Sequence, residues 1–161
     1  MSQRLVSYNT TEVKRSYYLN LFSDNAEKTL KGSKNMMFKW NIRDLQLGSI
    51  AEIALVQLSH TLSGAVGTHK DTAYAIRCLE TYADGFDSYN QTSAILYLGI
   101  GFTTPSIPTY HKIISNNLNT ITLIVTDDLT SATTVSNGIR TDISFAVVLH
   151  VVDYADPQNT Y

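Results

Sequence analysis

The sequence predicts an all-β protein, a β-sandwich of about eight antiparallel strands. Short apolar runs, separated by turns that contain Gly, Asn, Ser or Pro, fill the chain of 161 residues. Two runs alternate between apolar and polar side chains, as a strand with one buried face requires, because successive side chains point to opposite sides. On one face these runs place Met36, Phe38, Trp40 and Ile42, and then Ile143, Phe145, Val147, Leu149 and Val151.

The first four expected strands cover residues 16–22, 36–42, 51–58 and 73–79. In the first of them, Leu19 and Leu21 share one face. The third is apolar on both faces, which is typical of a strand covered on two sides and indicates a neighbouring subunit as the simplest cover. In the fourth, Cys78 lies on the same face as Tyr74 and Ile76, as a small core residue would.

The last four expected strands cover residues 94–100, 110–115, 120–126 and 143–152. Residues 110–115 show little alternation, whereas Pro105 and Pro108 exclude residues 103–109 from the interior of a sheet because proline lacks an N–H. The connectors are uneven in length, and the longest covers residues 127–142. Uneven connectors favour a jelly roll over an up-and-down barrel, and a Greek-key sandwich stays open as the third architecture.

One short helix is expected near residues 24–31. Asp24 is followed three residues later by Glu27, which resembles a capping box, and Gly32 stands where the helix would end. Residues 1–12 are polar and predict a flexible N-terminal arm, which leaves residues 13–161 as a single jelly-roll domain.

The composition favours contacts with other proteins. Charged residues make up 16% of the chain, so Ser, Thr, Asn and Tyr must supply much of the polar surface, as in a packed assembly or a sugar-binding module. The net charge of −2 argues against direct nucleic-acid binding. Residues 1–43 carry +5 and the remainder −7, which fits either a basic edge that meets an acidic neighbour or an ordinary solvated face.

No catalytic or metal-binding pattern is evident, so the sequence predicts neither an enzyme nor a bound cofactor or metal. His60, His69, His111 and His150 are widely spaced, and the one cysteine is better explained as a core residue than as a reactive thiol. Gly99 and Gly101 form a G-x-G without the third glycine of a dinucleotide site. No apolar run is long enough to span a membrane and no secretory signal is evident, so we expect synthesis in the cytoplasm.

The C-terminal third resembles the closing strands of small capsid proteins from icosahedral large DNA viruses and their virophage relatives. The resemblance rests on residues 118–128, on Gly138 and Ile139, and on residues 143–149. Residues 38–41 and the Tyr- and Asn-rich, charge-poor composition are similar as well. In that family a single jelly roll forms the penton at the fivefold vertex or serves as a minor capsid protein that cements larger capsomers.

The resemblance implies a structural virion protein that self-associates, as a pentamer if it is a penton, and docks on the major capsid protein and other minor capsid proteins. It would be made in the host cytoplasm and reside in the virion capsid. Under this hypothesis the basic residues of the N-terminal region tether neighbours, and two loops supply aromatic anchors. The candidate interface residues are Arg4, Lys14, Arg15, Phe86, Tyr89, Pro105, Pro108 and Tyr110.

A carbohydrate-binding, lectin-like sandwich is the alternative function. Exposed Tyr82, Tyr89 or Tyr97 would then stack on sugar rings. A cytokine-like trimer is a third possibility, which the missing secretory signal disfavours.

Overall fold

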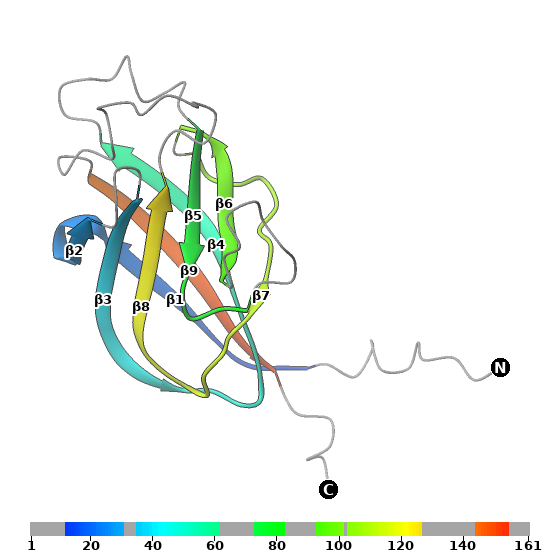
Figure 1. Cartoon of the computed structure of the whole chain (residues 1–161). Helices are drawn as coiled ribbons and strands as arrows, with labels where there is room; N and C mark the ends of the chain where they lie inside the picture. The colour runs from blue at the N-terminus through cyan, green and yellow to red at the C-terminus, as the bar shows by residue number, and fades with distance from the viewer. Residues whose placement is uncertain are drawn as a thin grey trace, which may run out of the picture.

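The protein is a sandwich of two antiparallel sheets (Figure 1). A computed structural model describes residues 12–30, 35–61, 73–82, 93–101, 103–126 and 144–154. The four-stranded sheet has the order β1 (Val13–Phe22), β9 (Ser144–Tyr154), β4 (Ile50–Thr61) and β7 (His111–Lys112). The five-stranded sheet has the order β2 (Glu27–Leu30), β3 (Asn35–Gln46), β8 (Asn117–Thr126), β5 (Ala73–Cys78) and β6 (Ala94–Ile100).

The strand pairing is that of a jelly roll. β1 pairs with β9, β3 with β8, β4 with β7 and β5 with β6, all antiparallel. The first half of the chain therefore runs beside the second half in reverse order. This double ribbon is rolled up by further pairing of β4 with β9 and of β5 with β8. The predicted jelly-roll sandwich is confirmed, with β2 as an additional edge strand.

The short helix predicted near residues 24–31 is wrong. Ser23–Asn25 form one 3₁₀ turn, and Glu27–Leu30 form β2 against β3. Asp24, which was part of the expected helix start, bonds to β9 instead: its Oδ1 accepts a hydrogen bond from Ser144 Oγ at 2.8 Å. The neighbouring Ser23 Oγ accepts one from the Phe145 backbone N–H at 2.9 Å. Tertiary pairing with two strands thus overrides the local helix signal.

Most expected strands are observed, with shifted ends. β3 continues to Gln46 through an irregularity between Asn41 and Leu45, and β8 begins earlier than expected, at Asn117. The weakly alternating run at residues 110–115 forms only β7, extended by an isolated bridge between Ile113 and Thr81. Within the described residues, no helix is long and apolar enough to cross a membrane.

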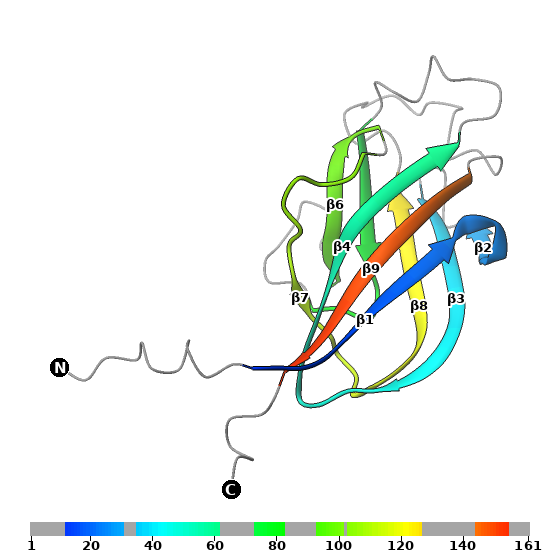
Figure 2. The ribbon, with the colours of Figure 1, turned by 180° about the vertical axis from the view of Figure 1, so that it is seen from behind.

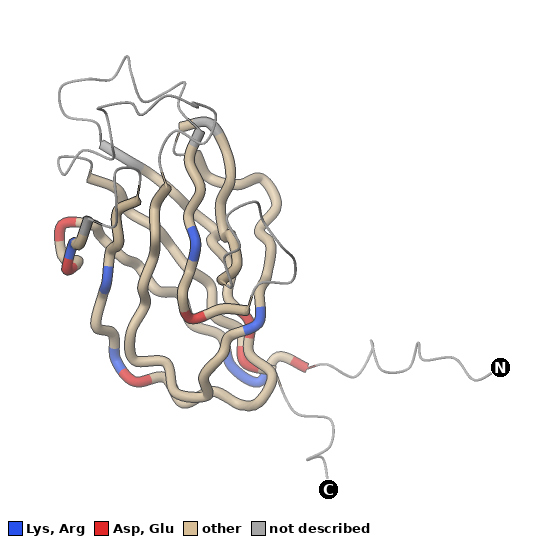
Figure 3. The backbone as a smooth tube through the Cα atoms, in the orientation of Figure 1, with Lys and Arg blue, Asp and Glu red and all other residues tan. Residues whose placement is uncertain are grey.

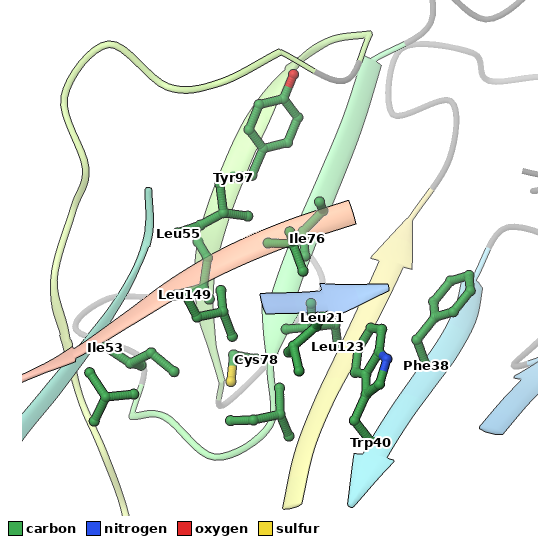
Figure 4. Close-up of a cluster of buried hydrophobic side chains, with 14 of the residues drawn as sticks. Leu21, Phe38, Trp40, Ile53, Leu55, Ile76, Cys78, Tyr97, Leu123 and Leu149 are labelled. Atoms are coloured by element: carbon green, nitrogen blue, oxygen red, sulfur yellow. The ribbon is translucent and has the colours of Figure 1, made fainter. Parts of the chain in front are cut away.

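The core lies between the two sheets (Figure 4). It contains these residues of the two alternating runs: Met36, Phe38, Trp40, Phe145, Val147, Leu149 and Val151. Phe38, Trp40 and Phe145 form its aromatic end, with the rings of Phe38 and Phe145 edge to face at a centroid distance of 4.8 Å. Trp40 is buried, and its Nε1–H donates to the Phe22 carbonyl at 2.8 Å. This bond ties β3 of one sheet to the end of β1 in the other, so the aromatic cluster also fixes how the sheets are stacked.

Candidate interaction surfaces

The segment between β6 and β7 is fixed to the four-stranded sheet by polar contacts at both of its ends. Thr104 Oγ1 donates to the Leu58 carbonyl and accepts from the Leu58 N–H, both at 3.1 Å. At the other end, the Tyr110 hydroxyl lies 2.8 Å from Nδ1 of His150, and the His150 ring stacks on Tyr18 at a centroid distance of 4.5 Å. Burial is the main reason why the pKa of Tyr110 is raised above its ordinary value.

This Tyr18–His150–Tyr110 cluster lies on the outer face of the four-stranded sheet. The neighbours of His150 in β9, Leu149 and Val151, belong to the core, so the imidazole points to the opposite side. Ala54 pairs with His150 in the sheet and is completely buried. We therefore attribute part of the cover on this face to aromatic residues of the same chain, where the sequence suggested a neighbouring subunit.

An open groove of about 550 Å³ runs between β6 and the segment that follows it. It is lined by residues 95–99, 103–107 and 109. Leu98 and Ile107 on its walls are 66% and 81% exposed, which is unusual for large apolar side chains. Tyr97, whose hydroxyl donates to the Gly101 carbonyl, is the one titratable side chain in the lining, so the groove can bind an apolar surface but holds no acid–base pair.

The groove and the cluster include two of the predicted interface residues, and a third lies between them in the same segment. Pro105 lines the groove, Pro108 is half-buried in the same segment, and Tyr110 is held by His150. The sequence placed these residues together in one loop, and the structure sets that loop against β4 and β6. Phe86 and Tyr89 lie outside the described residues.

The basic residues expected to tether neighbours have different surroundings. Arg4 lies outside the described residues, and Lys14 is exposed on β1. Arg15 is engaged within its own chain: its Nη2 donates to Asp153 Oδ2 at 2.9 Å and to the Gln46 carbonyl at 2.6 Å. The hydrogen bond to Asp153 is the main reason why the pKa of Arg15 is raised. Arg15 is therefore already engaged in contacts within its own chain, whereas Lys14 is exposed.

β1 presents an exposed edge that the sequence reasoning did not identify as a site. Tyr18 and Phe22 are 63% and 54% exposed, although both stand in a run without charged residues, Ser16 to Phe22. β1 is the outermost strand of its sheet (Figure 2). The pattern of apolar residues in the sequence cannot reveal that β1 is an edge strand. Edge and central strands have the same alternation of side chains and differ only in the number of strands that they pair with.

The described side chains that could react or bind a metal show no catalytic or metal-binding arrangement. Cys78 is buried, donates to Glu80 Oε2 at 3.3 Å, and has a pKa raised well above the usual value, mainly by burial. A thiol in this state is a poor nucleophile. The described part of the chain contains no group of three or more His, Cys, Asp and Glu side chains that could hold a metal ion. His69 and the side chain of His60 lie outside that part.

The two described tyrosines considered for sugar stacking differ in exposure. Tyr97 is buried, with 5% of its surface exposed, so its ring offers no platform to a sugar. Tyr82 is 47% exposed and lies 5.9 Å from Lys112 Nζ, measured to the ring centroid. Tyr89 is outside the described residues. The two described tyrosines therefore do not form a common stacking surface.

The fold and these surfaces define a class: a jelly-roll sandwich with apolar side chains exposed on an edge strand and along a groove. Figure 3 shows that β6 and β8 carry no Lys, Arg, Asp or Glu at all. Comparison of the sequence with known protein families gives no match, and no characterised protein matches it either.

Proposed function

We propose that the protein is a structural component of a viral capsid, a minor capsid or penton protein that self-associates and docks on the major capsid protein. One observation carries the proposal: Tyr18 and Phe22 are exposed on an edge strand, and Leu98 and Ile107 are exposed on the walls of an open, uncharged groove. Such surfaces fit protein–protein contact, whereas an enzyme site would bring titratable side chains together in a concave pocket.

The resemblance described above supports the same proposal. The stretches that carry it fall largely in β3, β8 and β9, and β3 is paired with β8. The similar stretches are therefore strands of the same sandwich. The jelly roll itself is compatible with other functions, so the resemblance and the exposed surfaces have to be considered together.

The surface of this chain that binds the proposed capsid partner would be the groove beside β6. Leu98 and Ile107 would supply apolar contact, and Tyr97 with Thr104 keeps the two walls in place through the Gly101 and Leu58 carbonyls. A groove without charged residues avoids the desolvation cost of burying ions at an interface.

Coexpression with the major capsid protein encoded by the same genome tests this function. We expect the two proteins to elute together, and we expect Leu98→Glu with Ile107→Glu to abolish coelution. Tyr82→Glu with Ile114→Glu is the matched control, because these residues are exposed outside the groove. Failure of the unmodified protein to coelute with any capsid protein would refute the proposal.

A truncation tests the role of the N-terminal arm. Removal of residues 1–12 should weaken assembly with the capsid protein while leaving the melting temperature nearly unchanged, because β1 starts at Val13. Unchanged assembly would exclude the arm as a tether.

A further inference from the structure

β1 is a long edge strand that lacks the features by which proteins usually prevent an edge from pairing with another strand. Proteins shield exposed edges with short strands, charged residues, prolines or bulges, because an open edge can pair with another strand. β1 has 10 residues, and from Ser16 to Phe22 it has no charge, no proline and no break in its pairing with β9. The irregularity in its register lies before this run, between Val13 and Arg15.

The other three edge strands are short, carry charge or lie beside another segment. β2 has 4 residues and begins with Glu27 and Lys28. β7 has 2 residues, one of them Lys112. β6 is followed by the segment with Pro105 that forms the second wall of the groove. Among the described edge strands, β1 is therefore the longest, and its uncharged run from Ser16 to Phe22 has no described segment along its free edge.

We infer that β1 pairs with β1 of a second copy of this chain, antiparallel and about a twofold axis at Leu19. The run from Ser16 to Phe22 is centred on Leu19, so this register pairs the whole uncharged run with itself. The two four-stranded sheets would join into one continuous sheet across the dimer, with the same surface used by both subunits. The inference rests on the proposed function for its role in a capsid and specifies how the self-association occurs.

The charges at the two ends of β1 favour the antiparallel orientation. Lys14 lies near the start of the strand and Asp24 just after its end, and both side chains are exposed. In the proposed register Lys14 of each copy approaches Asp24 of the other. A parallel arrangement would instead bring like charges together at both ends.

The outward-facing side chains of β1 are suited to this contact. In the proposed register Tyr18 lies opposite Asn20 of the second copy, and Phe22 opposite Ser16. Tyr18 is held by stacking on His150, so its ring is oriented before the subunits meet. Preorganised aromatic side chains lose less conformational entropy on association than flexible ones.

Light scattering over a range of protein concentrations tests the inference. We expect the unmodified protein to form dimers and the variant Tyr18→Lys with Asn20→Lys to dissociate, because each new lysine faces another across the axis. The dimer dissociation constant should rise by at least about tenfold. Asn41→Lys with Asn119→Lys is the control: both positions are exposed in the other sheet, and the added charge is the same.

Charge complementation tests the register. The variant Tyr18→Glu with Asn20→Glu should also be monomeric, and a mixture of the Glu and Lys variants should form a one-to-one heterodimer. A second measurement avoids reliance on charged variants: Tyr18→Cys with Asn20→Cys should form intermolecular disulfides on oxidation, whereas buried Cys78 stays reduced.

Several results would overturn the inference. These are a monomeric or pentameric unmodified protein, a Lys variant that stays dimeric, or a mixture that does not reassociate. A monomeric protein would also count against self-association in the proposed function, whereas docking on the capsid protein is tested separately by coelution. Conversely, a β1 dimer that does not bind any capsid protein would overturn the proposed function alone.

Discussion

Nη2 of Arg15 lies 2.9 Å from Oδ2 of Asp153, a carboxylate that is completely buried near the end of β9. Oδ1 of the same carboxylate accepts a hydrogen bond from the Gly48 N–H at 2.9 Å. One aspartate therefore joins β1, β9 and the turn between β3 and β4. The turn connects the two sheets, so Asp153 fixes the end of the sandwich at which β1 begins.

Loss of this carboxylate should be costly. Asp153→Ala removes the acceptor of the Gly48 N–H and the partner of Arg15, and we expect the free energy of unfolding to fall by about 3 kcal/mol. Urea denaturation followed by circular dichroism measures the change. Asp44→Ala, at an exposed carboxylate of β3, is the control and should have little effect. Equal losses for the two variants would contradict the structural role of Asp153.

Position 48 requires glycine because its backbone lies close to the Asp153 carboxylate. A Cβ at this position would lie 2.9 Å from Asp153 Oδ1, closer than van der Waals contact allows. We expect Gly48→Ala to reduce the free energy of unfolding by about 2 kcal/mol. In the Asp153→Ala background the same substitution should cost much less, and a double-mutant cycle measures the difference. Additive effects would show that the contact is not the cause.

Trp40 should report directly on the stacking of the two sheets. It is the single tryptophan of the chain, and its burial predicts a blue-shifted emission that moves to longer wavelength on unfolding. Trp40→Phe deletes the hydrogen bond to the Phe22 carbonyl and part of the ring volume, so we expect a loss of about 2 kcal/mol. Phe22→Leu keeps that carbonyl and should cost far less, since its side chain is exposed.

Stability should decline in alkaline solution. The pKa of Cys78 is raised above 9.0 by burial, and that of Tyr110 is raised above 10.0. Below pH 9 folded and unfolded chains both hold the thiol proton, whereas above it the unfolded chain releases the proton first. The free energy of unfolding should therefore be level at neutral pH and fall as the pH rises through these values.

Cys78→Ala provides the comparison for this pH dependence. Its free energy of unfolding should decline less between about pH 8 and pH 10 than that of the unmodified protein, because one linked proton is absent. Urea denaturation at each pH measures both slopes. Identical slopes would show that the thiol titrates alike in both states.

Local patterns identified strands more reliably than their ends or partners. The alternating runs in β3 and β9 were found because one face of each is buried and the other is not. β2 was missed because Asp24 and Glu27 resemble a helix start, and the competing pairing with β3 involves residues later in the chain. The two-residue β7 has too few residues to show any period.

The interaction surfaces were predicted only in part. The loop with Pro105, Pro108 and Tyr110 was selected from composition, but its groove depends on the distant β6 and its anchor on His150. Arg15 was expected to reach a neighbour, yet it pairs with Asp153, 138 residues away in sequence. Contacts across such separations leave no local signal in a single sequence.

The sequence by itself determined the all-β class, the face of each main strand that enters the core, and the low charge of the surface, because these depend on residue type and a period of two. The tertiary structure alone decided which strands became sheet edges. It also decided that Arg15 pairs with Asp153 of the same chain, and where exposed apolar side chains lie close together. These properties depend on pairing between β1 and β9 or between β3 and β8, and pairing is set by the packing of the whole chain.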